Sequence, residues 1–224
     1  MKVGLVSDTH GVFDPELSRV FQGVKHILHA GDVGSHGGSA AVLAAISQGS
    51  AVTVSAVRGN VDDDPEAIEL LPDTAVLHIA GWVLLIVHIL ESTEAAAAME
   101  QHEPDIVISG HSHKWKVDTV EATAGKRQLR INPGSAGPGR FKLGRSVALL
   151  TLPDRDSGTW PSVQRMDLAA KAPAKLPEAC RGKRSCQPRL QLQQNQQQSQ
   201  HLPPGARARR GGLQSGSKRQ KCEV

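Results

Sequence analysis

Tyrosine is absent from the sequence, and aromatic residues make up only 3% of its 224 positions. Hydrophobic residues still account for 39%, so a core can form, and it must be built mainly from aliphatic side chains. No apolar run approaches the roughly 18 residues that a membrane-spanning helix needs, so we expect no membrane span. The chain opens with MKVGLVSDTH, which leads directly into a predicted strand and lacks the apolar segment of a secretory signal.

Cysteine is scarce, and its three copies, Cys180, Cys186 and Cys222, all lie beyond residue 169. A disulfide framework is therefore excluded for the residues before them, and a reduced, cytoplasmic setting is the simpler expectation. Acidic residues are scarce in the same C-terminal segment. Residues 169–224 hold 12 Lys/Arg and 2 Asp/Glu, a balance of +10, whereas residues 1–168 hold 14 and 20, a balance of −6.

The segment after residue 168 also lacks apolar periodicity. It contains the glutamine-rich run QLQQNQQQSQ and the basic, glycine-rich run GARARRGG. Such composition does not bury enough apolar surface to offset the entropy of the chain. We therefore predict a folded domain over residues 1–168 and a disordered, basic, Gln-rich tail over residues 169–224. A solvated tail is favoured over one that contacts nucleic acid.

The first third of the chain alternates short apolar runs with helical patterns. Strands are predicted at 2–7, 26–29 and 52–57, and helices at 15–22 and 39–47, with Ser39 as the N-cap of the second helix. This βαβαβ order favours a largely parallel, covered sheet.

The pattern changes after residue 74. A hairpin is predicted around Ala80-Gly81, then a helix over 91–100, a strand ending at Ser109, and further strands at 116–121, 128–131 and 147–152. Because we expect these later strands to pair antiparallel, the predicted fold class is α/β, with two mixed sheets packed together and helices outside.

Polar side chains that can bind a metal ion follow five of these strands. They are two carboxylates, one amide and four imidazoles: Asp8, His10, Asp32, Asn60, His88, His111 and His113. One divalent ion does not need seven donors, but two ions about 3.5–4 Å apart do, with a carboxylate between them. Mixed oxygen and imidazole ligation suits Mn²⁺, Fe, Zn²⁺, Co²⁺ or Ni²⁺ better than Ca²⁺ or Mg²⁺.

Each of these residues also has an ordinary structural interpretation. Asp8 and Asp32 could cap helices, Asn60 could occupy a turn, and His88 could be a hydrogen-bonded core histidine. The joint pattern of DxH, GD, GN, H and GHxH, each following a predicted strand, argues against seven independent coincidences. Nearby, Arg58 and His36 are expected to be structural or solvated rather than phosphate ligands. The run Asp62-Asp63-Asp64 is expected to be a solvated loop or a helix N-terminus before Pro65.

The motifs SDTHG, HAGDVG, VRGNVDD, VHIL, SGHSH and INPGSAG resemble those of the calcineurin-like metallophosphoesterases. The likeness covers roughly residues 1–168. It is specifically to the compact bacterial and archaeal phosphodiesterases that share a fold with the retromer scaffold subunit. The resemblance implies a four-layer αββα sandwich and a dinuclear metal site.

Carried over by motif, the resemblance implies that Asp8, His10, Asp32 and His113 hold one ion. The bridging Asp32 would hold the second ion together with Asn60, His88 and His111. Two divalent ions, Mn²⁺ foremost, are the implied cofactors, and the implied substrate is a small phosphate ester. The implied reaction is hydrolysis by direct attack of a metal-bridging hydroxide, with Asp32, Asn60 and His111 as the residues acting in catalysis.

The sequence departs from the family pattern at two places. Val61 stands where many members carry a general-acid histidine, and Ile89 stands where many carry glycine after the fourth-motif histidine. A non-catalytic scaffold of the retromer-subunit type is the alternative interpretation. Asp32 and Asn60 match the hydrolytic pattern and favour the enzyme. The NPGS stretch at 132–135 is interpreted chiefly as a turn.

Overall fold

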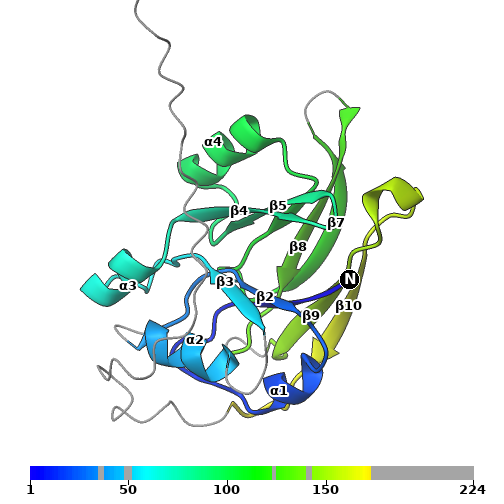
Figure 1. The fold of residues 1–224 in the computed structure, drawn as a ribbon. Coiled ribbons are helices and arrows are strands. Elements are labelled where there is room, and N and C mark those ends of the chain that lie inside the picture. Colours follow the sequence, from blue (N-terminus) through cyan, green and yellow to red (C-terminus); the bar gives the residue numbers. More distant parts are fainter. Residues whose placement is uncertain (35–37, 48–51, 123–124, 140–142, 173–224) are drawn as a thin grey trace, which may run out of the picture. The chain divides into compact units, whose positions relative to one another are not determined.

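Two mixed five-stranded sheets lie face to face at the centre of the domain (Figure 1). The computed structural model describes residues 1–34, 38–47, 52–122, 125–139 and 143–172. The first sheet has the order β10-β9-β1-β2-β3, formed by Ser162–Asp167, Ser146–Thr151, Lys2–Val6, His26–His29 and Thr53–Ala56. Its β1, β2 and β3 are parallel, with Gly4 opposite Ile27 on β2 and opposite Leu149 on the antiparallel β9.

The second sheet has the order β4-β5-β6-β8-β7, formed by Thr74–Ile79, Trp82–Val87, Ile106–Ile108, Arg127–Pro133 and Trp115–Glu121. Ala80 and Gly81, which join β4 to β5, both have positive φ, as a type I′ hairpin turn requires. The neighbours β5, β6 and β8 run parallel to one another. The expectation that the later strands pair antiparallel is therefore wrong for these three and right for the β4–β5 and β7–β8 pairs.

The aliphatic core expected from the composition fills the space between the two sheets. Its members on the first sheet include Leu5 and Leu28, and those on the second include Leu84, Ile86 and Ile108. Each of these side chains is almost wholly buried. Close packing between the two sheets therefore fixes the strand ends of one sheet relative to the strand ends of the other.

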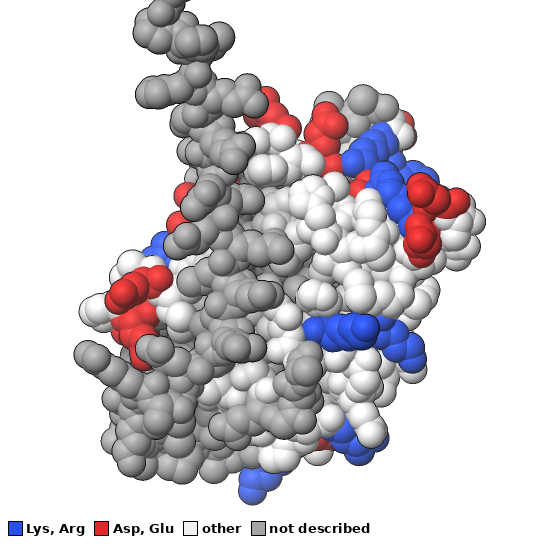
Figure 2. Space-filling view, in the orientation of Figure 1, with Lys and Arg blue, Asp and Glu red and all other residues white. Residues whose placement is uncertain are grey.

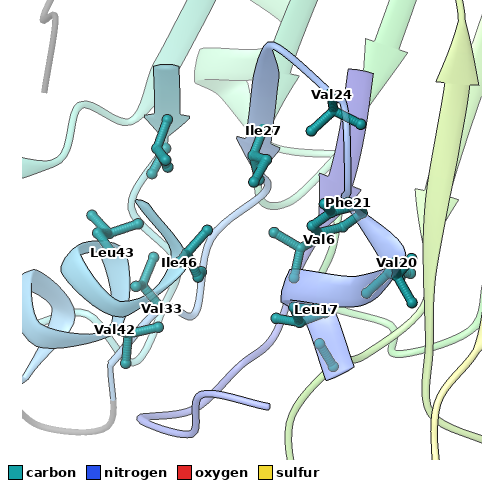
Figure 3. Close-up of a cluster of buried hydrophobic side chains, with 14 of the residues drawn as sticks. Val6, Leu17, Val20, Phe21, Val24, Ile27, Val33, Val42, Leu43 and Ile46 are labelled. Atoms are coloured by element: carbon teal, nitrogen blue, oxygen red, sulfur yellow. The ribbon is translucent and has the colours of Figure 1, made fainter. Parts of the chain in front are cut away.

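Helices cover the outer faces of both sheets. The helices α1 (Glu16–Val20) and α2 (Ser39–Ser47) pack on the first sheet through a cluster that includes Leu17, Val20, Val42 and Leu43 (Figure 3). The helix α3 (Pro65–Leu70) adds Ala67 to this cluster. On the second sheet, α4 (Thr93–His102) packs Ala95 and Ala98 against Leu85, Val87 and Val107. This is the predicted α/β sandwich.

Several element ends differ from the sequence predictions. Ser39 is the first residue of α2 rather than the residue before it. Asp64 caps α3 by accepting from the N–H of Ala67, so the prediction of a helix N-terminus with Pro65 at its first position is confirmed. The edge strand β10 was not predicted, and a 3₁₀ turn, η2 (Arg155–Ser157), precedes it. None of the helices in the described ranges is long and apolar enough to cross a membrane.

Acidic side chains cluster at one end of the first sheet's helical cover. Figure 2 shows acidic side chains gathered over α3, whose six residues include Glu66 and Glu69 and no basic residue. The predicted tail over residues 169–224 lies almost wholly beyond the described ranges, and so does His36.

Candidate metal centre

The seven predicted ligands come together where five strands end. Asp8 and His10 follow β1, Asp32 follows β2, Asn60 follows β3, His88 follows β5, and His111 and His113 follow β6. Backbone hydrogen bonds tie the neighbouring loops to one another. The N–H of Asp8 donates to Gly31 O at 3.0 Å, and the N–H of Gly110 donates to His88 O at 3.0 Å. A further contact joins the two sheets, because Nδ1 of His88 lies 2.7 Å from the carbonyl oxygen of Ala30.

Four of these residues form a buried set. Ligand-capable atoms of Asp8, His10, Asp32 and His113 lie within 4.8 Å of one another, and all four residues are buried. Nε2 of His113 lies 3.3 Å from Asp8 Oδ1 and 3.3 Å from Nε2 of His10. Nε2 of His10 lies 3.8 Å from Asp32 Oδ2. We call these four residues the buried set.

The other three residues, with the second oxygen of Asp32, form a more open set. Nε2 of His88 lies 3.3 Å from Asp32 Oδ1 and 3.1 Å from Asn60 Oδ1. Nδ1 of His111 lies 2.9 Å from the same amide oxygen. Asn60 and His111 are exposed to solvent, whereas His88 is buried. The two oxygens of Asp32 therefore face different groups of donors.

The backbone at the site adopts an uncommon conformation. Seven non-glycine residues in the described ranges have positive φ, and five of them are Asp8, His10, Asp32, His111 and His113. Residues other than glycine rarely adopt a positive φ, because this backbone conformation costs about 1–3 kcal/mol per residue. Five such residues at one place concentrate local backbone strain at the candidate metal centre.

Two glycines permit this crowding. A Cβ on Gly59 would overlap the backbone nitrogen and Oδ1 of Asp32, and a Cβ on Gly110 would overlap Oγ of Ser7. Glycine at 59 lets the Asn60 loop contact the loop after β2, and glycine at 110 lets the His111 loop contact the loop after β1.

Hydrogen bonds behind the ligands fix their orientation. Nδ1 of His88 lies 2.7 Å from the carbonyl oxygen of Ala30, so Nδ1 carries the proton and Nε2 offers its lone pair to the site. Oγ of Ser7 donates to Asp8 Oδ2 at 2.7 Å. Below them, Nε2 of the buried His29 lies 2.9 Å from Oγ1 of Thr9.

The end of β8 and the segment that follows it donate hydrogen bonds to the backbone of two site loops. Nδ2 of Asn132 donates to Gly110 O at 2.6 Å, and Oγ of Ser135 donates to the carbonyl oxygen of Asp8 at 3.0 Å. Residues 127–133 form a strand, and Gly134 and Ser135 continue as irregular chain, so the interpretation of 132–135 as chiefly a turn is wrong. These contacts place the segment against the site.

A buried arginine that no sequence pattern marks anchors this segment. Arg145 is 2% exposed and donates to the carboxylate of Asp14 at 2.8 Å, to Gly137 O at 2.8 Å and to Ala169 O at 2.7 Å. The N–H of Gly137 in turn donates to Asp8 O at 2.9 Å.

Burial and neighbouring charges change the acid–base behaviour of the site. Burial raises the pKa of Asp8 to about 7 and lowers the pKa of His29 to about 3. Burial also opposes the ionisation of Asp32, but the hydrogen bond and charge of His88 outweigh it and hold the pKa of Asp32 below its ordinary value. The same pairing raises the pKa of His88 against the effect of burial.

The donor set fits divalent metal ions. Neighbouring ligands of one ion bound at about 2.1 Å lie roughly 3 Å apart, and the close donor pairs described above are 2.9–3.3 Å apart. Oδ1 of Asp8 is buried and has no hydrogen-bond partner among the described residues, although buried carboxylate oxygens normally have one. A cation beside it would satisfy this oxygen.

A cavity of about 350 Å³ opens beside the open set. Asn60, His88 and Ile89 line it together with Arg58 and the exposed Asp63. Nε of Arg58 donates to Asp73 at 3.0 Å, so Arg58 is paired on the cavity wall, as the structural interpretation expected.

Asp62 is not solvated, contrary to the sequence-based expectation. It is 1% exposed and accepts hydrogen bonds from the backbone of two site loops. A run of three aspartates is typical of an exposed loop, and the sequence does not show which of the three carboxylates is buried.

A model of the calcineurin-like phosphoesterase superfamily domain matches residues 1–155 of the sequence. The chain belongs to this superfamily. Among solved structures, it resembles Vps29 of Entamoeba histolytica complexed with Zn²⁺, at 25% identity and a TM-score of 0.52, over 75% of this chain and 99% of that one. It also resembles an archaeal phosphodiesterase, at 20% identity and a TM-score of 0.54, over 75% and 100% of the two chains.

A third calcineurin-like neighbour is Vps29 of Cryptosporidium parvum, at 22% identity and a TM-score of 0.51, over 75% and 98% of the two chains. These likenesses agree with the fold that the sequence motifs implied. Among proteins with curated descriptions, none matches the chain.

Proposed function

We propose that the chain is a metal-dependent phosphoesterase that hydrolyses phosphodiesters at a centre of two divalent ions. The observation that carries the proposal is the position of Asp32, whose Oδ2 faces His10 of the buried set and whose Oδ1 faces His88 of the open set. A carboxylate with one donor group on each side is suited to bind two ions. Membership of the calcineurin-like phosphoesterase superfamily supports this activity, and the Zn²⁺ complex of a similar Vps29 supports the binding of metal.

The donors determine which ions suit the site. The buried set offers two carboxylates and two imidazoles, and the open set adds two more imidazoles and a neutral amide oxygen. This mixture favours Mn²⁺, with Fe, Zn²⁺, Co²⁺ and Ni²⁺ as alternatives, over ions that prefer oxygen alone. Only two of the seven ligands carry a negative charge, so a centre with two divalent ions stays positive and attracts an anionic ester.

When bound, two such ions supply a hydroxide at neutral pH and neutralise charge that develops on the phosphoryl oxygens. The residues of the chain provide the geometry. Asp32 is fixed by hydrogen bonds from Val61 N–H and by its contact with His88. The exposed Asn60 and His111 bring their donors to the solvent side of the site, where an ester can approach without passing through the core.

The cavity beside Asn60 and His88 is the proposed location for the alcohol part of the ester. Its volume of about 350 Å³ lies within the usual range for small-molecule sites. Asp63, Asp73 and Glu94 on its wall outnumber Arg58, which is itself paired with Asp73. Uncharged or cationic alcohol groups are therefore favoured there over groups that carry further phosphates.

The experiment that tests the proposal combines metal analysis with hydrolysis. Purified protein is assayed for bound transition metals and for turnover of bis-p-nitrophenyl phosphate and p-nitrophenyl phosphate with added Mn²⁺. We expect about two ions per chain and faster hydrolysis of the diester. His111→Ala should lose most of the activity, because His111 belongs to the open set. His78→Ala, at an exposed histidine on β4, should retain it.

Binding of two ions without turnover of either ester would reject the enzyme. That result would favour the alternative, a scaffold that retains the fold and the metal centre. Absence of bound metal after incubation with all five candidate ions would reject the metal centre itself.

A further inference from the structure

Asp62 is the most extensively bonded carboxylate near the metal centre. Its Oδ2 accepts from the backbone N–H of Val33 at 3.0 Å and of Gly59 at 2.9 Å. Its Oδ1 accepts from the N–H of Gly34 at 2.7 Å and from the hydroxyl of Ser39 at 3.2 Å. All four donors point at one buried side chain that none of the proposed metal contacts requires.

The donors of these hydrogen bonds flank two proposed ligands. Val33 directly follows Asp32 in the chain, and Gly59 directly precedes Asn60. The bonding is reciprocal, because the N–H of Val61, next to Asp62, donates back to Asp32 Oδ1 at 3.1 Å. The two loops are thus joined by hydrogen bonds in both directions.

The loops that carry Asp32 and Asn60 are in direct contact, so the distance between them depends on the hydrogen bonds of Asp62. A Cβ on Gly59 would overlap both the side chain and the backbone of Asp32, so the loop that carries Asn60 rests on Asp32 itself. If the hydrogen bonds of Asp62 are weakened, the Asn60 loop can move away from Asp32. The donors of the open set would then separate.

We propose that Asp62 is a positioning residue that sets the distance between Asp32 and Asn60 and thereby the affinity of the open set for its ion. The inference rests on the proposed function, since it presupposes that the open set binds a metal ion. Asp62 is not one of the proposed ligands, and although it lines the cavity, both of its oxygens are engaged by the four donors. It acts through backbone amides on either side of the metal centre.

The experiment compares Asp62→Asn with Asp64→Asn. Asparagine at 62 keeps the shape but replaces one acceptor oxygen with an NH₂ group, which leaves at least one backbone N–H without its partner. Asp64 lies two residues further on, and its side chain caps α3. Asparagine is an equally good cap, so this control makes the same charge change without touching the two loops.

Metal-free protein is titrated with Mn²⁺ by calorimetry. For Asp62→Asn we expect one of two binding steps to weaken about 10- to 100-fold, the usual effect of removing a group that orients metal ligands. The other step and the Asp64→Asn variant should stay within a few-fold of wild type. Amide hydrogen exchange of Val33, Gly34 and Gly59 in the metal-free protein should accelerate in Asp62→Asn alone.

Ser39→Ala provides a milder second variant in case Asp62→Asn does not fold. It removes one hydrogen bond to Asp62 and should weaken the same binding step about two- to tenfold. Unchanged affinity for both ions in a folded Asp62→Asn or in Ser39→Ala would overturn the inference, even if the free energy of unfolding fell. Wild-type protein that binds no ion would instead reject the proposed function on which the inference rests.

Discussion

The backbone N–H of Val61 donates to Oδ1 of Asp32 at 3.1 Å, while its side chain presents only methyl groups. The backbone at this position thus supports the metal centre, but its side chain offers no proton. If the chain is a phosphoesterase, the leaving alcohol must depart without a proton from this residue.

The first prediction is therefore a steep dependence of rate on the leaving group. A positioned general acid is worth about 10²–10⁴-fold, and its absence slows poor leaving groups most. Hydrolysis should slow sharply from nitrophenyl to alkyl diesters, measured as kcat/KM across a series of graded alcohol pKa. A flat series, with the chemical step shown to limit the rate, would mean that another group protonates the alcohol.

The second prediction concerns the shared carboxylate. Asp32→Asn should lose at least one bound ion and nearly all turnover, because one side chain is proposed to serve both ions. Metal content by mass spectrometry and hydrolysis of bis-p-nitrophenyl phosphate measure the two effects. Asp167→Asn, at an exposed carboxylate paired with Arg165, is the matched control. Two tightly bound ions in Asp32→Asn would contradict the dinuclear arrangement.

The third prediction follows from Asp8, whose pKa burial raises to about 7, against about 3.9 in an unfolded chain. Between these values the folded state retains a proton that the unfolded state has released. The contribution of Asp8 to stability therefore falls as pH rises from about 4 to about 7. With a chelator present, Asp8→Asn should match wild type at pH 4 and melt at a higher temperature than wild type at pH 7.

His29 contributes a pH dependence of stability that is opposite to that of Asp8. Burial lowers its pKa to about 3, so its contribution to stability is lost as pH falls from about 6.5 toward 3. The slopes from Asp8 and His29 oppose each other in wild type. Urea unfolding of Asp8→Asn without metal should show stability that rises with pH between 4.5 and 6.5 more steeply than in wild type. Parallel curves would contradict the shifted pKa of Asp8.

The fourth prediction places the end of the domain near residue 172. Arg145 donates to the carbonyl oxygens of Ala169 and Lys171, so we expect the folded part to continue past residue 168 as far as these two acceptors. Truncation after Ala172 should leave the melting temperature and hydrolysis unchanged, because the composition beyond it cannot form a core. Truncation after Leu168 should lower the melting temperature, because Arg145 then loses two acceptors. Equal melting temperatures for the two truncations would show that these bonds contribute nothing.

The meeting of the proposed ligands could be predicted because aspartate, asparagine and histidine recur at or shortly after the ends of the predicted strands. Asp8, Asp32 and His111 each follow an apolar run that forms a strand as expected. Parallel strands end at the same edge of a sheet, so the side chains that follow them meet. The order of the predicted elements already indicated two packed mixed sheets with helices outside, and the likeness of these motifs to a family added the four-layer αββα arrangement.

The supporting residues could not be predicted in this way. Asp62 meets the amide of Gly34 across 28 positions of sequence, and Arg145 meets Asp14 across 131. No local pattern marks such partners. The strand β10 escaped prediction because most of its residues are exposed, which removes the alternation that marks a half-buried strand. The parallel pairing of β5, β6 and β8 depends on a crossover that hydrophobic patterns do not encode.

The long reach of Arg145 also has a consequence for the order in which the site is completed during synthesis. Asp8 leaves the ribosome well before its partners, because its strand pairs with β9, and its loop is held by Gly137 and, through Arg145, by Ala169. Contacts this distant in sequence cannot form until both partners have emerged. A nascent chain that already displays all seven donors, up to His113, still lacks the strand and the anchor that fix the first of them. The centre that begins at residue 8 is therefore among the last parts of the domain to take its final form.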